Sequence, residues 1–291
     1  MRLRLRFHKM DSDSGATHAA LSLKDSVHYV ENVFKDYQRV SGLTRFEGKM
    51  AELGPGDNAG VALMFLGNGV TQADLADRFY SHRQDDQHKK IYEALASKHP
   101  AVTPFLKEGV PDPLKIKRYY GEEAAGETFF HQNKGYDYII SRSVLEHVDD
   151  VHGVLQSMYA ALNPQGLLIH KVDLRDHGMF TPFAYPLKFL EVPRWLYRLM
   201  TEGAGYPNRF LFHGYKKILT AINPKTRFYI SGLHGVPELE QEYLLESLPD
   251  DLKQKSVRYI NVHRHRFASE FKNVPAEDLM VSSFFFVCGK V

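Results

Sequence analysis

Residues 49–60, KMAELGPGDNAG, combine an acidic side chain with a glycine turn. Met50, Ala51 and Leu53 form a short apolar run that carries Glu52, and glycines follow at positions 54 and 56. A Cβ atom at such a turn would block it and would keep a ligand away from the backbone. An apolar pattern of helical spacing comes next. The stretch therefore predicts a strand, a tight turn and a helix that together hold a nucleotide-like cofactor.

A second acidic residue, Asp77, stands 25 residues after Glu52 and ends the next predicted strand. A carboxylate there can accept hydrogen bonds from both ribose hydroxyls of an adenosine. Asp74 is the alternative, but the helix before it needs until Gly69 to finish, so Asp77 suits the strand end better. We therefore assign Asp77, with Arg78 directly after it, to the cofactor site.

Acids, bases and hydrogen-bond donors crowd residues 170–178, HKVDLRDHG. Such a set suits the removal of a proton from a nucleophile, and histidine can do this near neutral pH. His177 is the candidate general base and Asp176 its orienting partner. Arg175 would grip an anionic substrate group, and His170 belongs to the same catalytic set. A solvated loop with a local salt bridge explains these residues equally well.

The same run also offers possible metal ligands in His170, Asp173, Asp176 and His177. Four ligands within eight residues seldom converge, so we expect no metal. A second histidine pair, in the run VHRHR, alternates with arginines at positions 264 and 266. It predicts one face of a short extended segment rather than a metal site.

The patterns between these groups indicate an α/β fold. Strand and helix signals alternate from Lys49 to Leu174, as in a parallel sheet covered on both faces. Predicted strands are 49–53, 70–77, 114–121, 136–144 and 167–174, with closing strands at 225–233 and 282–291. Predicted helices are 22–42, 56–66, 80–98 and 145–162, with a mostly helical stretch at 237–256; residues 99–113 are predicted to be loop and 163–166 a turn.

Bulk properties exclude some partners. The chain has 291 residues and a net charge of +2, which is too small to imply nucleic acid. No apolar run approaches the ~18 residues of a membrane span, and the basic start, residues 1–7, predicts an edge strand or frayed terminus. Residues 1–10 lack the apolar core of a signal peptide, and the one cysteine, Cys288, predicts a core residue. We expect a cytoplasmic protein without a membrane partner, and a homo-oligomer is possible.

These motifs resemble the class I S-adenosylmethionine-dependent methyltransferases. Their first motif is an acid followed by Gly-x-Gly, which ELGPGDN matches from Glu52 to Asn58, with Asn58 in place of the usual third glycine. Asp77 matches their ribose-binding acid. Residues 136–148, which include the triplet Leu145-Glu146-His147, resemble their fourth-strand motif. The run ALNPQGLLIH resembles their turn into strand five, with Gln165 where a second glycine is usual.

The resemblance implies a doubly wound, mostly parallel sheet of seven strands in the order 3-2-1-4-5-7-6, with the last strand antiparallel. It implies a helical N-terminal cover at residues 1–45 and a Rossmann-like methyltransferase domain at 46–291. Residues 175–224 break the alternation and predict a helical insertion. Its aromatic residues predict a lid, a packed helix or a dimer contact: Phe180, Phe183, Tyr185, Phe189, Trp195 and Tyr197.

The resemblance also implies a cofactor, S-adenosylmethionine, with S-adenosylhomocysteine as the product. Glu52 would lie near the methionine end, and the backbone of Gly54-Pro55-Gly56 and Asn58 would pass close to the cofactor. Glu122 or Glu123 would receive the adenine amino group. Ser141 and Arg142 would line the pocket near the methionine moiety.

The predicted function is methyl transfer to an oxygen or nitrogen of a small molecule or sugar. Two alternatives remain open. An NAD(P)-dependent oxidoreductase uses the same kind of glycine turn, although Asp57 after the turn would repel a pyrophosphate. A non-catalytic protein could bind the cofactor and engage a partner through the aromatic insertion.

Overall fold

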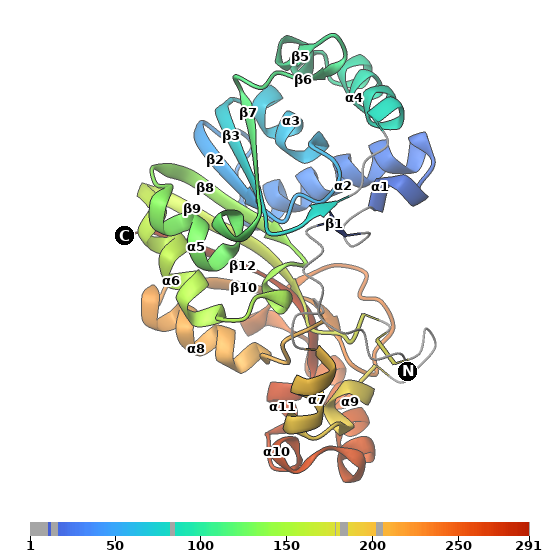
Figure 1. The fold of residues 1–291 in the computed structure, drawn as a ribbon. Helices are drawn as coiled ribbons and strands as arrows, with labels where there is room; N and C mark the ends of the chain where they lie inside the picture. The colour runs from blue at the N-terminus through green and yellow to red at the C-terminus, as the bar shows by residue number, and fades with distance from the viewer. Residues whose placement is uncertain are drawn as a thin grey trace. The chain divides into compact units, whose positions relative to one another are not determined.

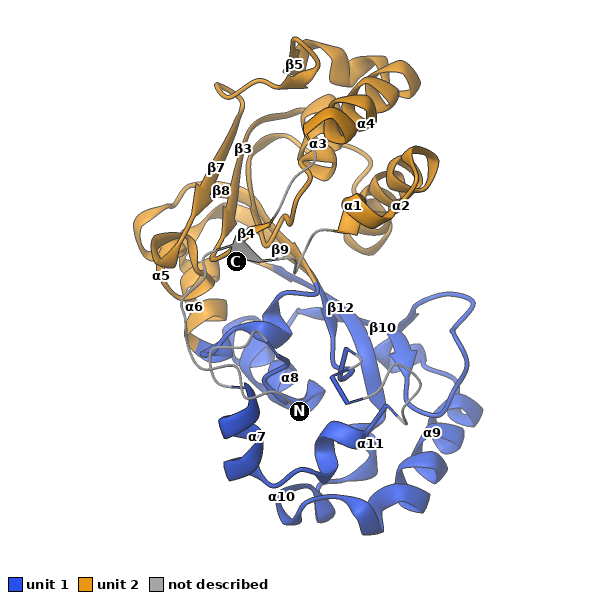
Figure 2. Ribbon diagram, turned by 45° about the vertical axis from the view of Figure 1, so that its right-hand side comes forward, with its two compact units in different colours: residues 1–7, 143–152, 171–288 blue, residues 8–142, 153–170, 289–291 orange. Residues whose placement is uncertain are grey.

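The computed structural model describes residues 11–12, 17–81, 85–177, 179–180, 186–201 and 206–290. The predictions for residues 1–10, Phe183 and Tyr185 lie outside these ranges. The chain forms two compact units (Figures 1 and 2). Unit 1 comprises the described parts of residues 143–152 and 171–288, and unit 2 those of 8–142, 153–170 and 289–291. The predicted division into 1–45 and 46–291 stays a prediction.

The main sheet has eight strands in the order β11-β10-β12-β9-β8-β2-β3-β7. Strand β2 pairs in parallel with β3 and β8, and β3 pairs in parallel with β7. Strand β10 is antiparallel to both β11 and β12. The strands are β2 (Gly48–Leu53), β3 (Val70–Asp77), β7 (Ile116–Tyr120), β8 (Tyr136–Arg142), β9 (Leu162–Asp173), β10 (Arg227–Leu233), β11 (Tyr243–Leu244) and β12 (Val281–Gly289).

The mostly parallel α/β sheet of the prediction is confirmed, but its seven-strand count is wrong. The eighth strand, β11, has only two residues and lies inside the stretch 237–256 that was predicted to be mostly helical. A two-residue strand is too short to show a period of two, so its pairing with β10 left no sequence signal.

The described helices are α1 (Thr17–Ala20), α2 (Leu23–Ser41), α3 (Gly60–Gly67), α4 (Asp85–Lys98), α5 (Gly126–Gln132), α6 (Val151–Ala161), α7 (Arg194–Thr201), α8 (Phe212–Ile222), α9 (Asp250–His263), α10 (Ser269–Lys272) and α11 (Ala276–Leu279). Short 3₁₀ helices are η1 (Pro100–Phe105), η2 (Glu122–Ala124), η3 (Leu145–His147), η4 (Lys188–Glu191), η5 (Leu245–Ser247) and η6 (Arg264–Arg266). Two small two-stranded sheets pair β1 (Asp11–Ser12) with β4 (Tyr80–Ser81), and β5 (Leu106–Lys107) with β6 (Val110–Pro111).

Helix α2 begins and ends where its sequence predicts. The Ser22 side chain accepts a hydrogen bond from the Asp25 N–H (3.1 Å), which satisfies a free donor of the first turn. Gly42 has φ 77°, and its N–H donates to the Gln38 carbonyl (2.9 Å). Glycine adopts this left-handed conformation without a steric penalty, so it ends the helix.

Several predicted boundaries are wrong for local reasons. Helix α4 starts at Asp85 rather than Tyr80 because Tyr80–Ser81 pairs with β1. The predicted helix 145–162 divides into η3 and α6, and the break holds Asp149-Asp150, residues that favour helix N-termini. The predicted turn 163–166 lies within β9, where Gln165 has φ 68°.

Three more segments depart from the prediction. Helix α5 was not predicted. The proline-rich segment 99–113 contains η1 and the β5–β6 hairpin rather than loop alone. The run His263–Arg266 is helical rather than extended, because it ends α9 and forms η6.

Each unit has its own buried apolar core. In unit 2, Figure 1 shows α2 and α3 on one side of β2 and β3, and Phe65 of α3 packs on Phe34 and Phe46 with ring centroids 5.1 and 4.6 Å apart. In unit 1, residues 281–288 of β12 are all buried, among them Phe284 and Cys288. The prediction that Cys288 is a core residue is therefore confirmed.

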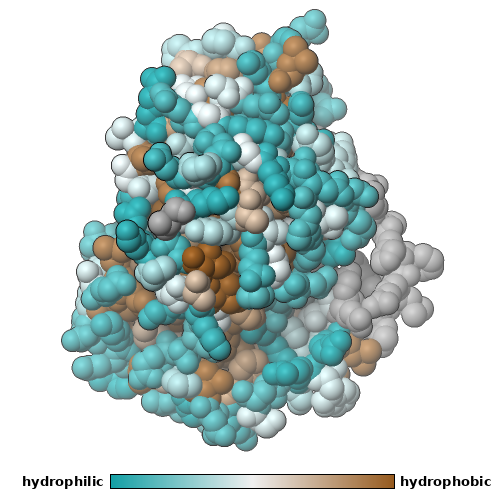
Figure 3. All heavy atoms as spheres, turned by 90° about the vertical axis from the view of Figure 1, so that its left-hand side faces the viewer, coloured by the Kyte–Doolittle hydropathy of each residue, from teal (hydrophilic) through white to brown (hydrophobic). Residues whose placement is uncertain are grey.

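Hydrophilic residues predominate on the face drawn in Figure 3, where apolar residues lie in small groups.

Helix α2, with 19 residues, is the longest helix of the described chain. None of the described helices, α2 included, is both long enough and apolar enough to span a membrane.

Candidate cofactor site and acceptor cluster

The strand ends of unit 2 meet at one edge of the sheet. Leu53 at the end of β2 is in register with Ala76 of β3 and with Ser141 of β8. Asp77 at the end of β3 is in register with Tyr120 of β7. Ligands of doubly wound sheets bind outside the carboxyl ends of the strands, so this edge is the candidate cofactor site.

The glycine turn leaves β2 at this edge in a conformation that requires glycine. Gly54 has φ 69° and Gly56 has φ 63°, both in the left-handed region. The Gly54 N–H donates to the Ala76 carbonyl (2.8 Å), and Arg118 Nη1 donates to the Gly56 carbonyl (3.3 Å). These bonds hold the backbone of the turn against β3 and β7.

Asn58 lies between the glycine turn and helix α3, which begins at Gly60 with Ala59 as its N-cap residue. The side-chain oxygen of Asn58 accepts a hydrogen bond from the Gly60 N–H (2.6 Å). Asn58 is buried, and its Nδ2 has no hydrogen-bond partner in the described chain. That amide remains available as a donor at the edge of the glycine turn.

Glu52 is a buried acid beside the glycine turn, only 7% exposed. Burial raises its pKa to about 7; nearby Arg118 opposes this shift and Asp77 adds to it. Its Oε2 has no hydrogen-bond partner among the described residues. A buried carboxylate oxygen without a hydrogen-bond partner lowers the stability of the fold. A cationic or N–H group of a ligand would supply that partner.

The second acid, Asp77, accepts a hydrogen bond at Oδ1 from the Phe79 N–H (2.9 Å). Next to it, Arg78 donates to both carboxylate oxygens of Glu122 (3.0 and 2.8 Å). Glu122 and Glu123 are both exposed. The adenine contact predicted for one of these two acids stays a prediction, and the Arg78 pair already engages Glu122.

Strand β8 contributes Ser141 and Arg142 at the same edge. Ser141 Oγ lies 2.7 Å from His170 Nδ1, and both residues are fully buried. Burial lowers the pKa of His170 to about 3, which keeps its imidazole neutral. Arg142 Nη1 donates to Asp36 of α2 (2.8 Å), and Tyr37 of α2 has a buried hydroxyl without a partner in the described chain.

In unit 1, Glu146 and His177 form the centre of a second cluster, which we call the acceptor cluster and which also contains His147. Glu146 is 1% exposed, and its Oε1 lies 3.5 Å from His177 Nε2. Burial raises the pKa of Glu146 to about 7, and the contact with Glu146 raises the pKa of His177 above its usual value. The rings of His147 and His177 stand edge to face, with centroids 5.0 Å apart.

The carboxylate next to His177 is thus Glu146, which matched the sequence motif but received no role there. Asp176 is buried and its carbonyl accepts from the Met179 N–H (3.0 Å); its predicted role as partner of His177 stays a prediction. Arg175 donates through Nε to both oxygens of Asp173 (2.8 and 3.1 Å), which lowers the pKa of Asp173 against the effect of burial.

Asn208 and Tyr215 fix the backbone that carries Glu146. Asn208 Nδ2 donates to the carbonyls of Leu145 (3.0 Å) and Val148 (2.9 Å), and its N–H donates to the Glu146 carbonyl (2.6 Å). The Tyr215 hydroxyl also donates to the Leu145 carbonyl (3.0 Å). Two residues distant in sequence therefore hold η3 in place.

Replacing Asn208 by alanine is expected to destabilise the fold by about 2 kcal/mol, because the Val148 carbonyl loses its side-chain donor and the Leu145 carbonyl keeps only the Tyr215 hydroxyl. Chemical denaturation of Asn208→Ala and of the parent chain measures this difference. Asn261→Ala, at an exposed asparagine of α9, is the matched control and should change little. Equal stability of Asn208→Ala and the parent would show that the Asn208 hydrogen bonds do not stabilise the η3 backbone.

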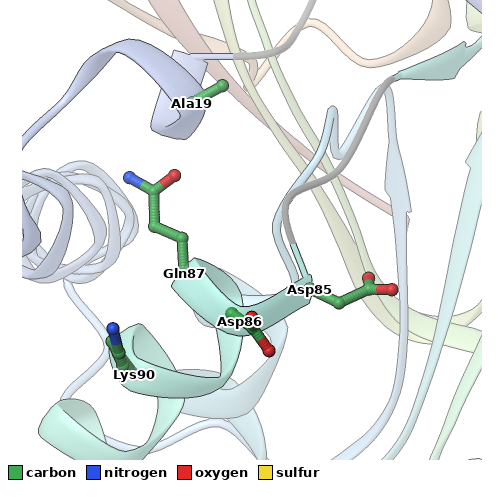
Figure 4. Close-up of a pocket in the computed structure, with 5 residues that line it drawn as sticks. All are labelled: Ala19, Asp85, Asp86, Gln87 and Lys90. Carbon is green, nitrogen blue, oxygen red and sulfur yellow. The ribbon is translucent and has the colours of Figure 1, made fainter.

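Each unit contains a hollow among its described residues. One, of about 460 Å³, is lined by Ala19 of α1 and by Asp85, Asp86, Gln87 and Lys90 of α4. Figure 4 shows Gln87 extending toward α1, and its Nε2 donates to the His18 carbonyl (2.7 Å). The other, of about 10 Å³, is in unit 1 and is lined by Glu146 and residues around Asn208. It has room for about one water molecule.

The fold and the site at the strand ends define a Rossmann-like protein that binds a nucleotide-like cofactor. A family model described as a methyltransferase domain matches residues 28–212. The chain belongs to this family, the class I S-adenosylmethionine-dependent methyltransferases that its motifs resemble.

No curated protein matches the sequence. Among solved structures, phosphoethanolamine N-methyltransferase 2 of Haemonchus contortus, in complex with phosphomonomethylethanolamine and S-adenosylhomocysteine, is 13% identical with a TM-score of 0.44 and covers 89% of this chain. The chain spans 53% of the length of that protein. YcgJ of Bacillus subtilis is 14% identical (TM-score 0.44), with 90% of this chain and 98% of that chain covered.

An S-adenosylmethionine-dependent methyltransferase of Mesorhizobium loti is 12% identical, with a TM-score of 0.44, and the match covers 92% of this chain and all of that chain. Identities this low say nothing about the methyl acceptor. The residues present at the strand ends do fit S-adenosylmethionine: Gly54 and Gly56 have the left-handed conformation, Asp77 ends β3, and Glu52 has a buried carboxylate oxygen without a hydrogen-bond partner among the described residues.

Proposed function

We propose that this chain transfers a methyl group from S-adenosylmethionine to an oxygen or nitrogen of a small molecule or sugar. The observation that carries the proposal is Glu52 Oε2, a buried carboxylate oxygen without a partner beside the left-handed glycine turn. A cofactor that brings a cationic group to this position relieves the cost of burying the charge.

The residues of unit 2 hold the cofactor, which supplies an electrophilic methyl group when it is bound. Glu52 receives its ammonium group, directly or through backbone amides, and Asp77 accepts hydrogen bonds from the ribose hydroxyls. Ser141 and Arg142 line the methionine end, and Glu122 or Glu123 receives the adenine amino group. An NAD(P)-dependent oxidoreductase is disfavoured by membership of the methyltransferase family and by Asp57 directly after the turn.

The residues of unit 1 prepare the acceptor. His177 accepts the proton of the acceptor hydroxyl or amine, and Glu146 stabilises the imidazolium that forms, since the two side chains are 3.5 Å apart. Arg175 binds an anionic part of the substrate, and Asp176 supports the loop. His170, which is neutral and buried, serves by positioning Ser141. The chain's low net charge favours a small acceptor over nucleic acid.

A ligand panel tests the cofactor. S-adenosylhomocysteine should raise the melting temperature of the chain, and NAD and NADP should not, because only a ligand of the native state stabilises it. The reverse result would support the oxidoreductase. Binding without turnover on a broad panel of hydroxyl and amine acceptors would support the non-catalytic alternative.

Asp77→Ala should weaken the binding of S-adenosylhomocysteine about 10- to 100-fold, because charge-assisted hydrogen bonds to the ribose are lost. Isothermal titration calorimetry measures the affinity. Asp86→Ala, at an exposed acid of α4, is the control and should bind like the parent. Unchanged affinity of Asp77→Ala would remove Asp77 from the site.

A further inference from the structure

The acceptor cluster of unit 1 contains the set of side chains that metal sites use. Within the described residues, one group of at least three possible ligands has its ligand atoms within 4.8 Å of one another: Glu146, His147 and His177. The sequence analysis named four other possible ligands, and the structure does not bring their ligand atoms together in this way: His170, Asp173, Asp176 and His177. The cluster thus keeps one of those four side chains and adds two from η3.

Glu146 gives an independent indication of a ligand. Its Oε1 accepts from the Asp173 N–H (3.3 Å) and lies near His177, but Oε2 is buried with no hydrogen-bond partner in the described chain. Glu146 is 1% exposed, so no hydrogen bond replaces the lost hydration of Oε2. A cation placed at this carboxylate would compensate for that loss.

The two histidines occupy the more open side of the cluster. The side chain of His177 is 31% exposed and His147 is partly buried, so further ligands from solvent or substrate have access. His177 has φ 52°, an unfavourable conformation for a residue with a Cβ, and such strain persists where the surroundings fix it. Asn208 and Tyr215 hold the η3 backbone that carries Glu146 and His147, as a preorganised site requires.

We infer that Glu146, His147 and His177 bind a divalent transition-metal ion of the zinc type. Two imidazoles and one carboxylate suit such an ion better than magnesium, which prefers oxygen ligands. Three protein ligands leave coordination positions open, as catalytic sites do.

The role of the ion rests on the proposed function. A bound cation polarises the acceptor oxygen and lowers the pKa of its hydroxyl, whose proton then passes to water. His177 is a ligand in that state, so the ion replaces the proton transfer that His177 provides in the metal-free chain.

Metal analysis tests the site without any need for an acceptor. The full chain is treated with a chelator, dialysed against zinc sulfate and analysed for bound metal by mass spectrometry; cobalt(II) replaces zinc for visible absorption spectra. One ion per chain and a ligand-field spectrum are expected. His147→Ala and His177→Ala should each weaken binding by more than about tenfold, since loss of even an outer partner costs that much.

His152→Ala, at an exposed histidine of the same unit, is the matched control and should bind metal like the parent. Glu146→Gln keeps an oxygen at this position but removes its charge, so it should bind more weakly than the parent. Binding of S-adenosylhomocysteine by every variant shows that unit 2 is intact, and loss of that binding in the parent would count against the proposed function rather than the metal site. Substoichiometric metal in the parent, or parent-like binding by His177→Ala, would overturn the inference.

Discussion

Replacing Glu52 by glutamine should make the ligand-free chain more stable at pH 8 and, at the same time, a weaker binder of S-adenosylhomocysteine. Burial raises the pKa of Glu52 from the ordinary 4.5 to about 7. Because the folded-state pKa is the higher one, ionisation of this group reduces stability as the pH rises from about 4.5 to about 7, and the loss is complete above that range. This ionisation lowers the free energy of unfolding by about 3 kcal/mol.

Glutamine cannot ionise, so Glu52→Gln avoids this loss. Its melting temperature should exceed that of the parent at pH 8, and the difference should vanish near pH 4.5. Thermal melts across this range measure the effect. Glu93→Gln, at an exposed acid of α4, should follow the parent at every pH.

The affinity of the parent for S-adenosylhomocysteine should rise as the pH rises through about 7, because the ammonium group of the ligand requires the ionised carboxylate and binding releases the proton of Glu52. Titrations in buffers of different ionisation enthalpy report that proton. Glu52→Gln should bind about 30-fold or more weakly above pH 7 and show a flatter pH profile, since a buried charge loses its partner. Equal affinity and equal stability in the two proteins would place Glu52 outside the cofactor site.

His177→Ala should lower turnover about 10²- to 10⁴-fold, the usual contribution of general acid–base catalysis. The loss is expected whether His177 accepts the proton or holds a cation, because either role activates the acceptor. S-adenosylhomocysteine affinity should stay at the parental value, since the proposed cofactor contacts belong to unit 2.

Turnover is measured as S-adenosylhomocysteine formed with the best acceptor of the panel. His152→Ala should retain parental turnover. Full activity of His177→Ala would exclude this histidine from acceptor chemistry, whereas a loss of cofactor affinity in the same variant would point to a structural effect.

The elements around the candidate cofactor site of unit 2 were predictable because their sequence signals are local. Residues 49–60 contain a complete strand, turn and helix start, and the structure places them as β2, the left-handed glycines and α3. Asp77 ends β3 as predicted, because the spacing of a short βαβ unit leaves little freedom. Its contact with a ribose stays a prediction.

The acceptor cluster of unit 1 was less predictable because its contacts join residues that are distant in sequence. Glu146 and His177 are 31 residues apart, and the backbone that holds Glu146 is fixed by Asn208 from a third segment. One signal was present: the acid–histidine pair Glu146-His147 stands a few residues after strand β8. The pattern near His170 gave no sign that this side chain would be fully buried against Ser141.

The burial of Cys288 has a practical consequence. Its thiol lies in the interior of β12 with a pKa raised by burial, which makes it a poor nucleophile toward maleimides. A cysteine introduced on an exposed helix would then be the reactive thiol, with no need to mutate the native one. A fluorophore attached in this way to α4 would report the addition of cofactor through the surroundings of unit 2 alone.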